Sequence, residues 1–329
     1  MDSDLSTQPE LVVQLAKIIE PKSKVAILLA TYNGSKYIRE FLDSLVAQTY
    51  TDFKLMVRDD GSTDETLEII HSYAHKIKIA FIEANVRLGP ANSFFELLMH
   101  TDNNFDFYFF ADQDDYWQNS KIERAVDKLS AKKEQIALYC SRLEYVDDNL
   151  AHIKYSRIPK AIAFENALVE NIAIGCTVAL TQSARQLIIE NPPCPVIMQN
   201  WWFYHDWWAY IVIVTFGTVI YDAFPSIKYR QHDNNSLGAA TNIFQDLYRR
   251  IKRFIKNDSG IFGLATQAKE FKRCFSWMLK DNQLDLLENI IDGKDNIIKR
   301  FKLAFASRLI RQRYFDTFIL RALFLIGRF

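Results

Sequence analysis

Residues 105–117 read FDFYFFADQDDYW, and this stretch decides the fold that the sequence predicts. Five apolar or aromatic residues run without a break over Phe107–Ala111. A continuous apolar run of this length, bounded by polar residues, is typical of a strand buried on both faces of a parallel sheet. Three carboxylates then follow within four positions, at Asp112, Asp114 and Asp115. Because ligands bind just beyond the carboxyl ends of strands in open α/β sheets, these acids are candidates for a binding site.

The three carboxylates predict a metal site, with Mg²⁺ or Mn²⁺ as the cation. Acids this close together repel one another unless a cation lies between them, and oxygen ligands suit these two metals. A metal held in this way usually serves a phosphate group. The alternative is a solvated acidic turn after a strand, and an isolated DxDD motif is compatible with both interpretations.

The chain before this stretch alternates strands and helices. We expect strands at 24–30, 53–58 and 77–83, and helices at 36–48, from 63 or 64 onward, and at 90–100. With the strand at 107–111, this order predicts an α/β fold with a doubly wound, mostly parallel sheet. No GxGxxG follows the first strand and no GxxxxGK[ST] occurs in the chain, so dinucleotide-binding and P-loop interpretations lose their main support.

Polar clusters follow three of these strands. Tyr32 and Asn33 follow the first, Asp59 and Asp60 follow the second, and the acids of 112–115 follow the last. The carboxyl ends of parallel strands meet at one edge of a sheet, so the three clusters are expected to lie together. Their combination is far more specific for a binding site than any one of them.

The remainder of the chain is less regular. We expect a helix at 121–132, a strand at 136–146, a loop at 147–165, an apolar strand within 167–180, a short helix at 184–190 and a strand at 219–221. The most aromatic stretch reads NWWFYHDWWAYIVIVTFG at 200–217 and has Asp206 near its centre. Residues 227–235 are polar and rich in potential ligands.

The 329 residues carry no formal net charge, which argues against a nucleic acid as partner. This balance hides an asymmetry, because residues 241–329 contain 18 Lys and Arg against 9 Asp and Glu, a net charge of +9. The tail places these basic residues among Phe, Ile and Leu at helical spacing, which suits a surface that lies on anionic lipid. The alternative is a helical lid that packs on the main domain with its basic side in water, and both can hold at once.

We divide the chain into an N-terminal helical extension at 1–23, a main domain at 24–240 and a basic amphipathic helical region at 241–329. The four cysteines are scattered without a CxxC pair, as expected for reduced core residues of a cytoplasmic protein. The first ten residues lack the layout of a secretory signal, and no uncharged apolar run reaches the ~18 residues expected of a transmembrane helix. We therefore expect a cytoplasmic protein that is peripheral on the inner face of the cell membrane.

Five stretches resemble a known family. They are KVAILLATYNG (24–34), SLVAQTYTDFKLMVRDDGSTDET (44–66), ADQDDYWQNSKI (111–122), HDWWAYIVIVTFG (205–217) and YRQHDNN (229–235). The first three resemble the family-2 inverting glycosyltransferases of the GT-A fold, and the third corresponds to the metal-binding DxD segment of that family. The last two resemble a subgroup rich in rhamnosyltransferases of bacterial surface polysaccharides. The QxxRW signature of processive relatives is missing, which indicates addition of a single sugar.

The resemblance implies a set of donor-binding residues: Thr31, Tyr32, Asn33, Asp59, Asp60, Arg87, Asn92 and Asp112. Tyr32 would stack on the donor base, Asp60, supported by Asp59, would accept a hydrogen bond from the base, and Asp112 would meet the ribose. Arg87 or Asn92 would reach the diphosphate. The structural alternatives are a packed ring for Tyr32, helix caps for the two acids after the second strand and a surface position for Arg87.

The resemblance also assigns the metal and the chemistry. Asp114 would bind the metal that bridges the two donor phosphates, and Asp115 would orient the waters of the metal. His232 would be a ligand of the metal or of the diphosphate, with a purely structural histidine as the alternative. Asp206 matches the general base of the family. Trp202, Trp207, Trp208 and Arg230 would line the acceptor or sugar site, although the tryptophans are equally suited to an ordinary core.

These residues predict a metal-dependent inverting glycosyltransferase that moves one sugar from a nucleotide-diphosphate donor to a hydroxyl of a lipid-linked bacterial surface glycan. dTDP-L-rhamnose is the leading donor, and a UDP-hexose or UDP-N-acetylhexosamine is the alternative. A nucleotidyltransferase remains a rival, although it should show a phosphate loop rich in Gly, Arg and Lys after the first strand. A non-catalytic glycan- or membrane-binding protein is a second rival, but it would not need Asp112, Asp114 and Asp206 together.

Overall fold

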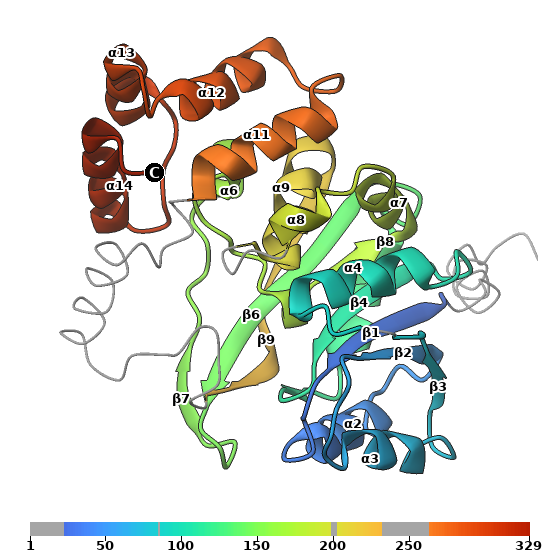
Figure 1. Ribbon diagram of the computed structural model, residues 1–329. Helices are drawn as coiled ribbons and strands as arrows, with labels where there is room; N and C mark the ends of the chain where they lie inside the picture. Colours follow the sequence, from blue (N-terminus) through green and yellow to red (C-terminus); the bar gives the residue numbers. More distant parts are fainter. Residues whose placement is uncertain (1–22, 85, 199–202, 232–262) are drawn as a thin grey trace, which may run out of the picture.

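The computed structural model describes residues 23–84, 86–198, 203–231 and 263–329 (Figure 1). Within these residues, nine strands form one mixed sheet in the order β3-β2-β1-β4-β8-β6-β9-β5, with β7 paired to β6. The strands are β1 (Val25–Thr31), β2 (Phe53–Asp59), β3 (Lys78–Phe81), β4 (Phe107–Asp112), β5 (Tyr116–Trp117), β6 (Ala137–Val146), β7 (His152–Tyr155), β8 (Ala179–Thr181) and β9 (Thr218–Arg230). Residues 1–22 of the predicted N-terminal helical extension lie outside the described residues.

The first four strands along the chain are parallel neighbours, as the sequence predicts. β1 pairs with β2 and β4, β2 pairs with β3, and the remaining parallel pair is β6 with β9. β8 runs antiparallel between β4 and β6, and the short strands β5 and β7 are antiparallel to β9 and β6. The expected parallel sheet of β1 to β4 is therefore extended by strands β5 to β9, which pair in both parallel and antiparallel directions.

Helices cover both faces of this sheet, and the C-terminal ones from α12 onward pack on other helices. The helices and helical turns of the described residues are α2 (Ile38–Val46), α3 (Thr66–Ser72), α4 (Pro90–His100), α5 (Lys121–Ser130), α6 (Phe164–Ala167), the 3₁₀ turn η2 (Gly175–Thr177), α7 (Gln182–Glu190), α8 (Pro195–Met198), α9 (His205–Phe216), α11 (Leu264–Phe275), α12 (Asp281–Asp292), α13 (Ile297–Phe301), the π-helical turn η4 (Lys302–Ala306) and α14 (Tyr314–Ile326). One core cluster takes its side chains from α4, α7, α9 and the C-terminal helices, and the other takes them from α2, α3 and α5.

The unbroken apolar run of β4 follows from this two-sided cover. Tyr108 and Phe110 belong to the core cluster on the α4 side, whereas Phe107, Phe109 and Ala111 belong to the cluster on the α2 side. Successive side chains of a strand point to opposite faces, so a strand covered on both sides needs apolar residues at every position.

β9 is much longer than the strand expected at 219–221. Its polar residues have partners within the fold: the Asp222 carboxylate accepts hydrogen bonds from Arg124 Nε at 3.0 Å and from the Tyr139 hydroxyl at 3.0 Å. Pro225 pairs with Arg142, where the register of β6 shifts on both sides. Such irregularities let a proline remain within a sheet.

Two other segments differ from the prediction. The expected loop at 147–165 contains β7, whose four residues (HIKY) are all exposed and are too few to stand out as a strand in the sequence. The expected strand within 167–180 is reduced to the start of β8, because η2 interrupts it at Gly175–Thr177.

The C-terminal helices share the core with the sheet. The buried Phe271 ring of α11 lies 5.8 Å from the Trp208 ring, 5.0 Å from Phe275 and 5.9 Å from Phe164, measured between centroids. The boundary at 240/241 stays a prediction, because it falls on residues that the structure does not describe. Within the described ranges, none of the helices combines the length and the apolar character needed to cross a bilayer.

We expect Phe271→Ala to lower the free energy of unfolding by about 3–5 kcal/mol, because it leaves a cavity between α11 and α9. Urea denaturation followed by circular dichroism measures this change. Phe318→Ala is the matched control, since its ring is 69% exposed and its removal should change stability by no more than about 0.5 kcal/mol. Equal effects of the two substitutions would contradict the shared core.

Candidate active site

A pocket of about 790 Å³ opens at the carboxyl ends of β1, β2 and β4. Parallel neighbouring strands bring these ends to one edge of the sheet, which is why three distant polar clusters meet there. Seven predicted site residues line the pocket: Thr31, Tyr32, Asn33, Asp60, Arg87, Asp112 and Asp114. Its other lining residues include Lys36, Tyr37, Gln113 and Tyr229, which the sequence analysis does not single out.

Asp59 shapes the turn after β2 and is not among the pocket-lining residues. Its carboxylate accepts hydrogen bonds from the backbone N–H groups of Gly61 (3.0 Å) and Ser62 (2.7 Å) and from the Ser62 hydroxyl. It also accepts one from the Thr31 hydroxyl at 2.7 Å, which joins the ends of β1 and β2.

Asn33 fixes the loop after β1 to the same turn. Its side-chain oxygen accepts a hydrogen bond from the Thr63 N–H at 2.8 Å, and its own N–H donates to the Ser62 hydroxyl at 2.9 Å. Asn33 adopts a left-handed backbone conformation, with φ of 46°, which asparagine tolerates better than most residues. The wall of the pocket formed by the first two strand ends is therefore held by side chains.

Asp60 lines the pocket and holds the segment that precedes α4. It forms a buried ion pair with Arg58 and accepts hydrogen bonds from Gly89 N–H at 2.7 Å and from the Ser93 hydroxyl at 3.0 Å. In the same segment, Arg87 lies over a pocket-lining aromatic ring.

Tyr32 and Arg87 form a stacked pair at the mouth of the pocket. The Arg87 guanidinium lies 3.7 Å from the centroid of the Tyr32 ring, which is 36% exposed. Asn92, by contrast, directs its side-chain amide to the Leu88 carbonyl at 3.2 Å, in the segment just before its own helix.

Gln113, the variable residue of the DxD motif, connects two walls of the pocket. Its side-chain amide accepts a hydrogen bond from Tyr32 N–H and donates one to the Tyr32 carbonyl, both at 3.0 Å. The amide lies so close to Gly34 that a Cβ at this glycine would be 2.3 Å from Gln113 Oε1. The sequence alone gives no signal for this role, because it depends on a contact 81 positions away.

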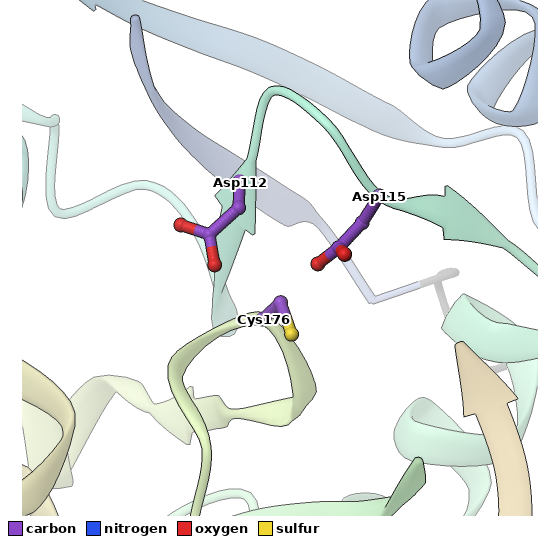
Figure 2. A group of neighbouring side chains, drawn as sticks. All are labelled: Asp112, Asp115 and Cys176. Atoms are coloured by element: carbon purple, nitrogen blue, oxygen red, sulfur yellow. The ribbon is translucent and has the colours of Figure 1, made fainter. Parts of the chain in front are cut away.

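The acid loop, residues 112–115, closes the other end of the pocket. Figure 2 shows the carboxylates of Asp112 and Asp115 pointing toward the Cys176 side chain of η2, and their ligand atoms lie within 4.8 Å of one another. Burial and the negative charges of Asp114 and Asp206 raise the pKa of Asp112 to about 8. Burial and its two acidic neighbours also raise the pKa of Asp115 well above its usual range.

Lys121 is a buried cation whose charge interacts with Cys176 and Asp115 of this cluster. It is fully buried, with Nζ 4.4 Å from the centroid of the Trp117 ring. Burial lowers the pKa of its ammonium to about 8, against the charge of Asp115. Neither the Lys121 amine nor the two Asp115 oxygens have a hydrogen-bond partner among the described residues.

These donors fit a hard divalent cation. Asp112 and Asp114 line the pocket and offer oxygen atoms. Burial and neighbouring acids raise the pKa of Asp112, and a bound cation would lower it again by stabilising the carboxylate. Burial raises the pKa of the Cys176 thiol, so this sulfur stays protonated and does not act as a thiolate ligand. Asp115 is enclosed behind the loop, at 1% exposure.

Asp206 lies beside the acid loop, in the first turn of α9. It is 8% exposed, and its carboxylate accepts hydrogen bonds from Gly175 N–H at 2.7 Å and Trp207 N–H at 2.6 Å. Burial raises the pKa of Asp206 to about 6, and these backbone donors oppose the shift. Its charge contributes to the raised pKa of Asp112, although Asp206 itself is not among the pocket-lining residues.

The other predicted residues lie outside the pocket lining. Trp207 donates from Nε1 to the Ala167 carbonyl at 2.6 Å, and Trp208 is fully enclosed in the core beside Phe271. Its place in the core argues against a sugar-binding role for Trp208. Trp202 and His232 lie outside the described residues.

Arg230 supports the acid loop from behind. Its buried guanidinium donates to the Asp114 carbonyl at 3.2 Å and to the Glu40 carboxylate at 2.6 Å, and it also reaches the Asp148 carbonyl. It lies over the Tyr37 ring at 4.6 Å. Its contacts are those of a residue that positions the pocket wall.

Comparison with known proteins agrees with this geometry. Residues 26–187 match the sequence model of Glycosyl transferase family 2. The chain is also 32% identical over 240 residues to the dTDP-rhamnosyl transferase RfbG of Shigella flexneri, a match that spans 68% of this chain and 78% of that relative. The chain belongs to glycosyl transferase family 2. It is therefore a glycosyltransferase, as predicted, and the nucleotidyltransferase and non-catalytic alternatives are set aside.

This glycosyltransferase is also similar to a second curated relative and to a solved structure. It is 24% identical over 174 residues to the putative teichuronic acid biosynthesis glycosyltransferase TuaG of Bacillus subtilis, covering 52% of this chain and 67% of that relative. The crystal structure of S. aureus TarS residues 1–349 in complex with UDP-GlcNAc superposes with a TM-score of 0.57 at 15% identity, covering 93% of this chain and 81% of that chain. The GT-A fold and the helical C-terminal part are thus confirmed.

The contact between Gly34 and Gln113 gives a test of the pocket wall. We expect Gly34→Ala to destabilise the protein by about 1–3 kcal/mol, because the new methyl group displaces the Gln113 amide from the Tyr32 backbone. In a Gln113→Ala background the same change should cost at least about 1 kcal/mol less. Urea denaturation of the four proteins of this double-mutant cycle measures the coupling, and strictly additive costs would contradict the contact.

Proposed function

We propose that this glycosyltransferase transfers one sugar, with inversion and with the help of a divalent metal, from a nucleotide-diphosphate donor to a hydroxyl of a lipid-linked bacterial surface glycan. The observation that carries the proposal is the meeting of Asp112 and Asp114 at one end of the pocket with a separately held carboxylate, Asp206, beside them. The acceptor implies work at the inner face of the cell membrane.

dTDP-L-rhamnose is the donor that we favour. RfbG, named as a dTDP-rhamnosyl transferase, is a relative over most of the chain. A UDP-hexose or UDP-N-acetylhexosamine is the second candidate, because the TarS structure with a similar fold is a complex with UDP-GlcNAc. Identity of 15% supports the fold of this neighbour and leaves the donor to be tested.

The pocket offers separate places for the parts of the donor. The stacked Tyr32 and Arg87 pair presents a flat surface for a pyrimidine base, with Asp60 and Asn33 at its edge. Asp112 and Asp114 also line the pocket and would meet the ribose and the metal on the diphosphate. Lys36 also lines the pocket and adds a positive charge.

A divalent cation held by Asp112 and Asp114 would act as a Lewis acid for the departing diphosphate, which is a common arrangement in glycosyltransferases of this fold. Gln113 and Arg230 keep the acid loop in place from two sides. Asp206 is held separately from these acids, by the Gly175 and Trp207 N–H groups, and inversion would need it to act on the face of the sugar opposite the diphosphate.

Asp206 accepts the proton of the attacking acceptor hydroxyl. A pKa near 6 keeps this carboxylate ionised at pH 7 while making it a stronger base than an ordinary aspartate. The N–H groups of Gly175 and Trp207 each bind one of its oxygens and so fix its orientation. A single displacement then inverts the anomeric carbon without a nucleophilic residue.

Asp206→Asn should lower sugar transfer by at least ~100-fold, because the amide cannot take the proton, while nucleotide affinity stays within about twofold. Transfer is measured with radiolabelled donor and affinity by calorimetry with the nucleoside diphosphate. Asp127→Asn, at an exposed position of α5, is the control and should change neither. Near-normal transfer by the Asp206 variant would place the base elsewhere.

The pH dependence follows from the same group. A base works only when ionised, so transfer should rise as pH increases through about 6 and then level off. The profile is obtained from rates at saturating donor and metal, measured from about pH 5 to about pH 8. A rate that is flat across this interval would contradict the role of Asp206.

Asp114→Ala should remove the metal-dependent part of donor affinity, because it takes away an oxygen ligand that lines the pocket. A panel of dTDP- and UDP-sugars, titrated with Mn²⁺, with Mg²⁺ and with EDTA, tests the metal and the donor together. If the variant binds every donor as the wild type does in the presence of metal, the assignment of Asp114 is incorrect.

A further inference from the structure

The C-terminal helices α13 and α14, with the turn η4 between them, carry large apolar side chains on the solvent side. Six of them form what we call the C-terminal apolar face, and each is between 50% and 69% exposed: Ile297, Phe301, Phe305, Phe315, Phe318 and Ile326. Figure 1 shows α13 and α14 beside each other, at the end of the molecule away from α2 and α3. Single exposed apolar residues are ordinary, but a concentration of this kind marks an interaction surface.

The spacing of these residues gives each segment one outward stripe. Ile297, Phe301 and Phe305 recur at intervals of four, and the rings of Phe301 and Phe305 stack with centroids 6.0 Å apart. Phe315, Phe318 and Ile326 lie on one side of α14 at helical spacing.

The opposite side of these elements is already occupied. Leu303, Leu320 and Phe324 are buried in the core cluster that also contains α9 and α11. A surface helix normally needs only one apolar stripe, so the second stripe requires a different partner.

Charge identifies that partner. Residues 294–329 contain nine Lys and Arg against two Asp, and one of these acids, Asp316, is buried. Lys302, Arg308 and Arg321 are exposed among the apolar residues. Basic residues that alternate with Phe and Ile suit the boundary between anionic headgroups and acyl chains.

We propose that the C-terminal apolar face binds an anionic lipid bilayer, with the aromatic rings at the acyl boundary and the basic residues at the headgroups. A second copy of the chain would bring the same excess of positive charge against this face. Residues 232–262 are also basic, with five Lys and Arg against three Asp. The proposal deepens the proposed function, since it names the surface that meets the membrane of a lipid-linked acceptor, but lipid binding does not depend on the donor or on catalysis.

The experiment is sedimentation of the full chain with vesicles of phosphatidylcholine alone and of equal parts phosphatidylcholine and phosphatidylglycerol. We expect binding to the anionic vesicles only, and a lower affinity at high salt.

The triple variant Phe301→Ser/Phe305→Ser/Phe318→Ser should lose at least about tenfold in partition coefficient, and Lys302→Glu/Arg308→Glu/Arg321→Glu should do the same. The matched control Val46→Ser/Phe81→Ser, at exposed apolar positions outside the C-terminal helices, should bind as the wild type does.

Unchanged circular dichroism and thermal unfolding would show that the variants are folded. Wild-type protein that ignores anionic vesicles, or a triple variant that binds them equally well, would overturn the proposal. So would a fall in molecular mass by light scattering in the triple variant, because the face would then join copies of the chain. Donor hydrolysis by the wild type is measured in parallel without lipid. If no hydrolysis is found, this counts against the proposed function and leaves the lipid-binding proposal untouched.

Discussion

Repulsion among carboxylates is the constraint on which the rest of the site depends. Asp112, Asp114, Asp115 and Asp206 converge where the parallel half of the sheet meets the mixed half. Three of them have pKa values raised by burial, and the charges of neighbouring acids add to the shift at Asp112 and Asp115. Such a cluster is costly to hold together unless positive charge or N–H donors compensate it.

The surrounding structure supplies this compensation from several directions. The buried ammonium of Lys121 lies on the Asp115 side, the Gly175 N–H binds Asp206, and the Arg230 guanidinium ties the backbone of the acid loop to α2. A divalent cation on the open side would complete the set. The acids are thus held by protein groups on the buried side, while Asp112 and Asp114 face the pocket.

The sequence predicts well what local pattern decides. The apolar run before Asp112 marks a strand covered on both faces, and the polar clusters after β1, β2 and β4 do line one pocket. It fails where a contact from a distant segment decides, as with Asp222 in β9, whose charge is neutralised by Arg124. The role of Gln113 cannot be predicted from the sequence for the same reason, since it depends on a contact with Tyr32. A core tryptophan such as Trp208 cannot be distinguished from a sugar-binding one until its neighbours are known.

The three-residue turn η2 joins the acid loop to the first turn of α9. The Gly175 N–H binds Asp206, and the adjacent Cys176 lies against the acid loop, so one short turn sets the spacing between Asp206 and that loop. A side chain at Gly175 would come within 3.1 Å of His205, which leaves this turn little room to vary. The distance between the proposed base and the proposed metal site is therefore set by the backbone of a single short turn.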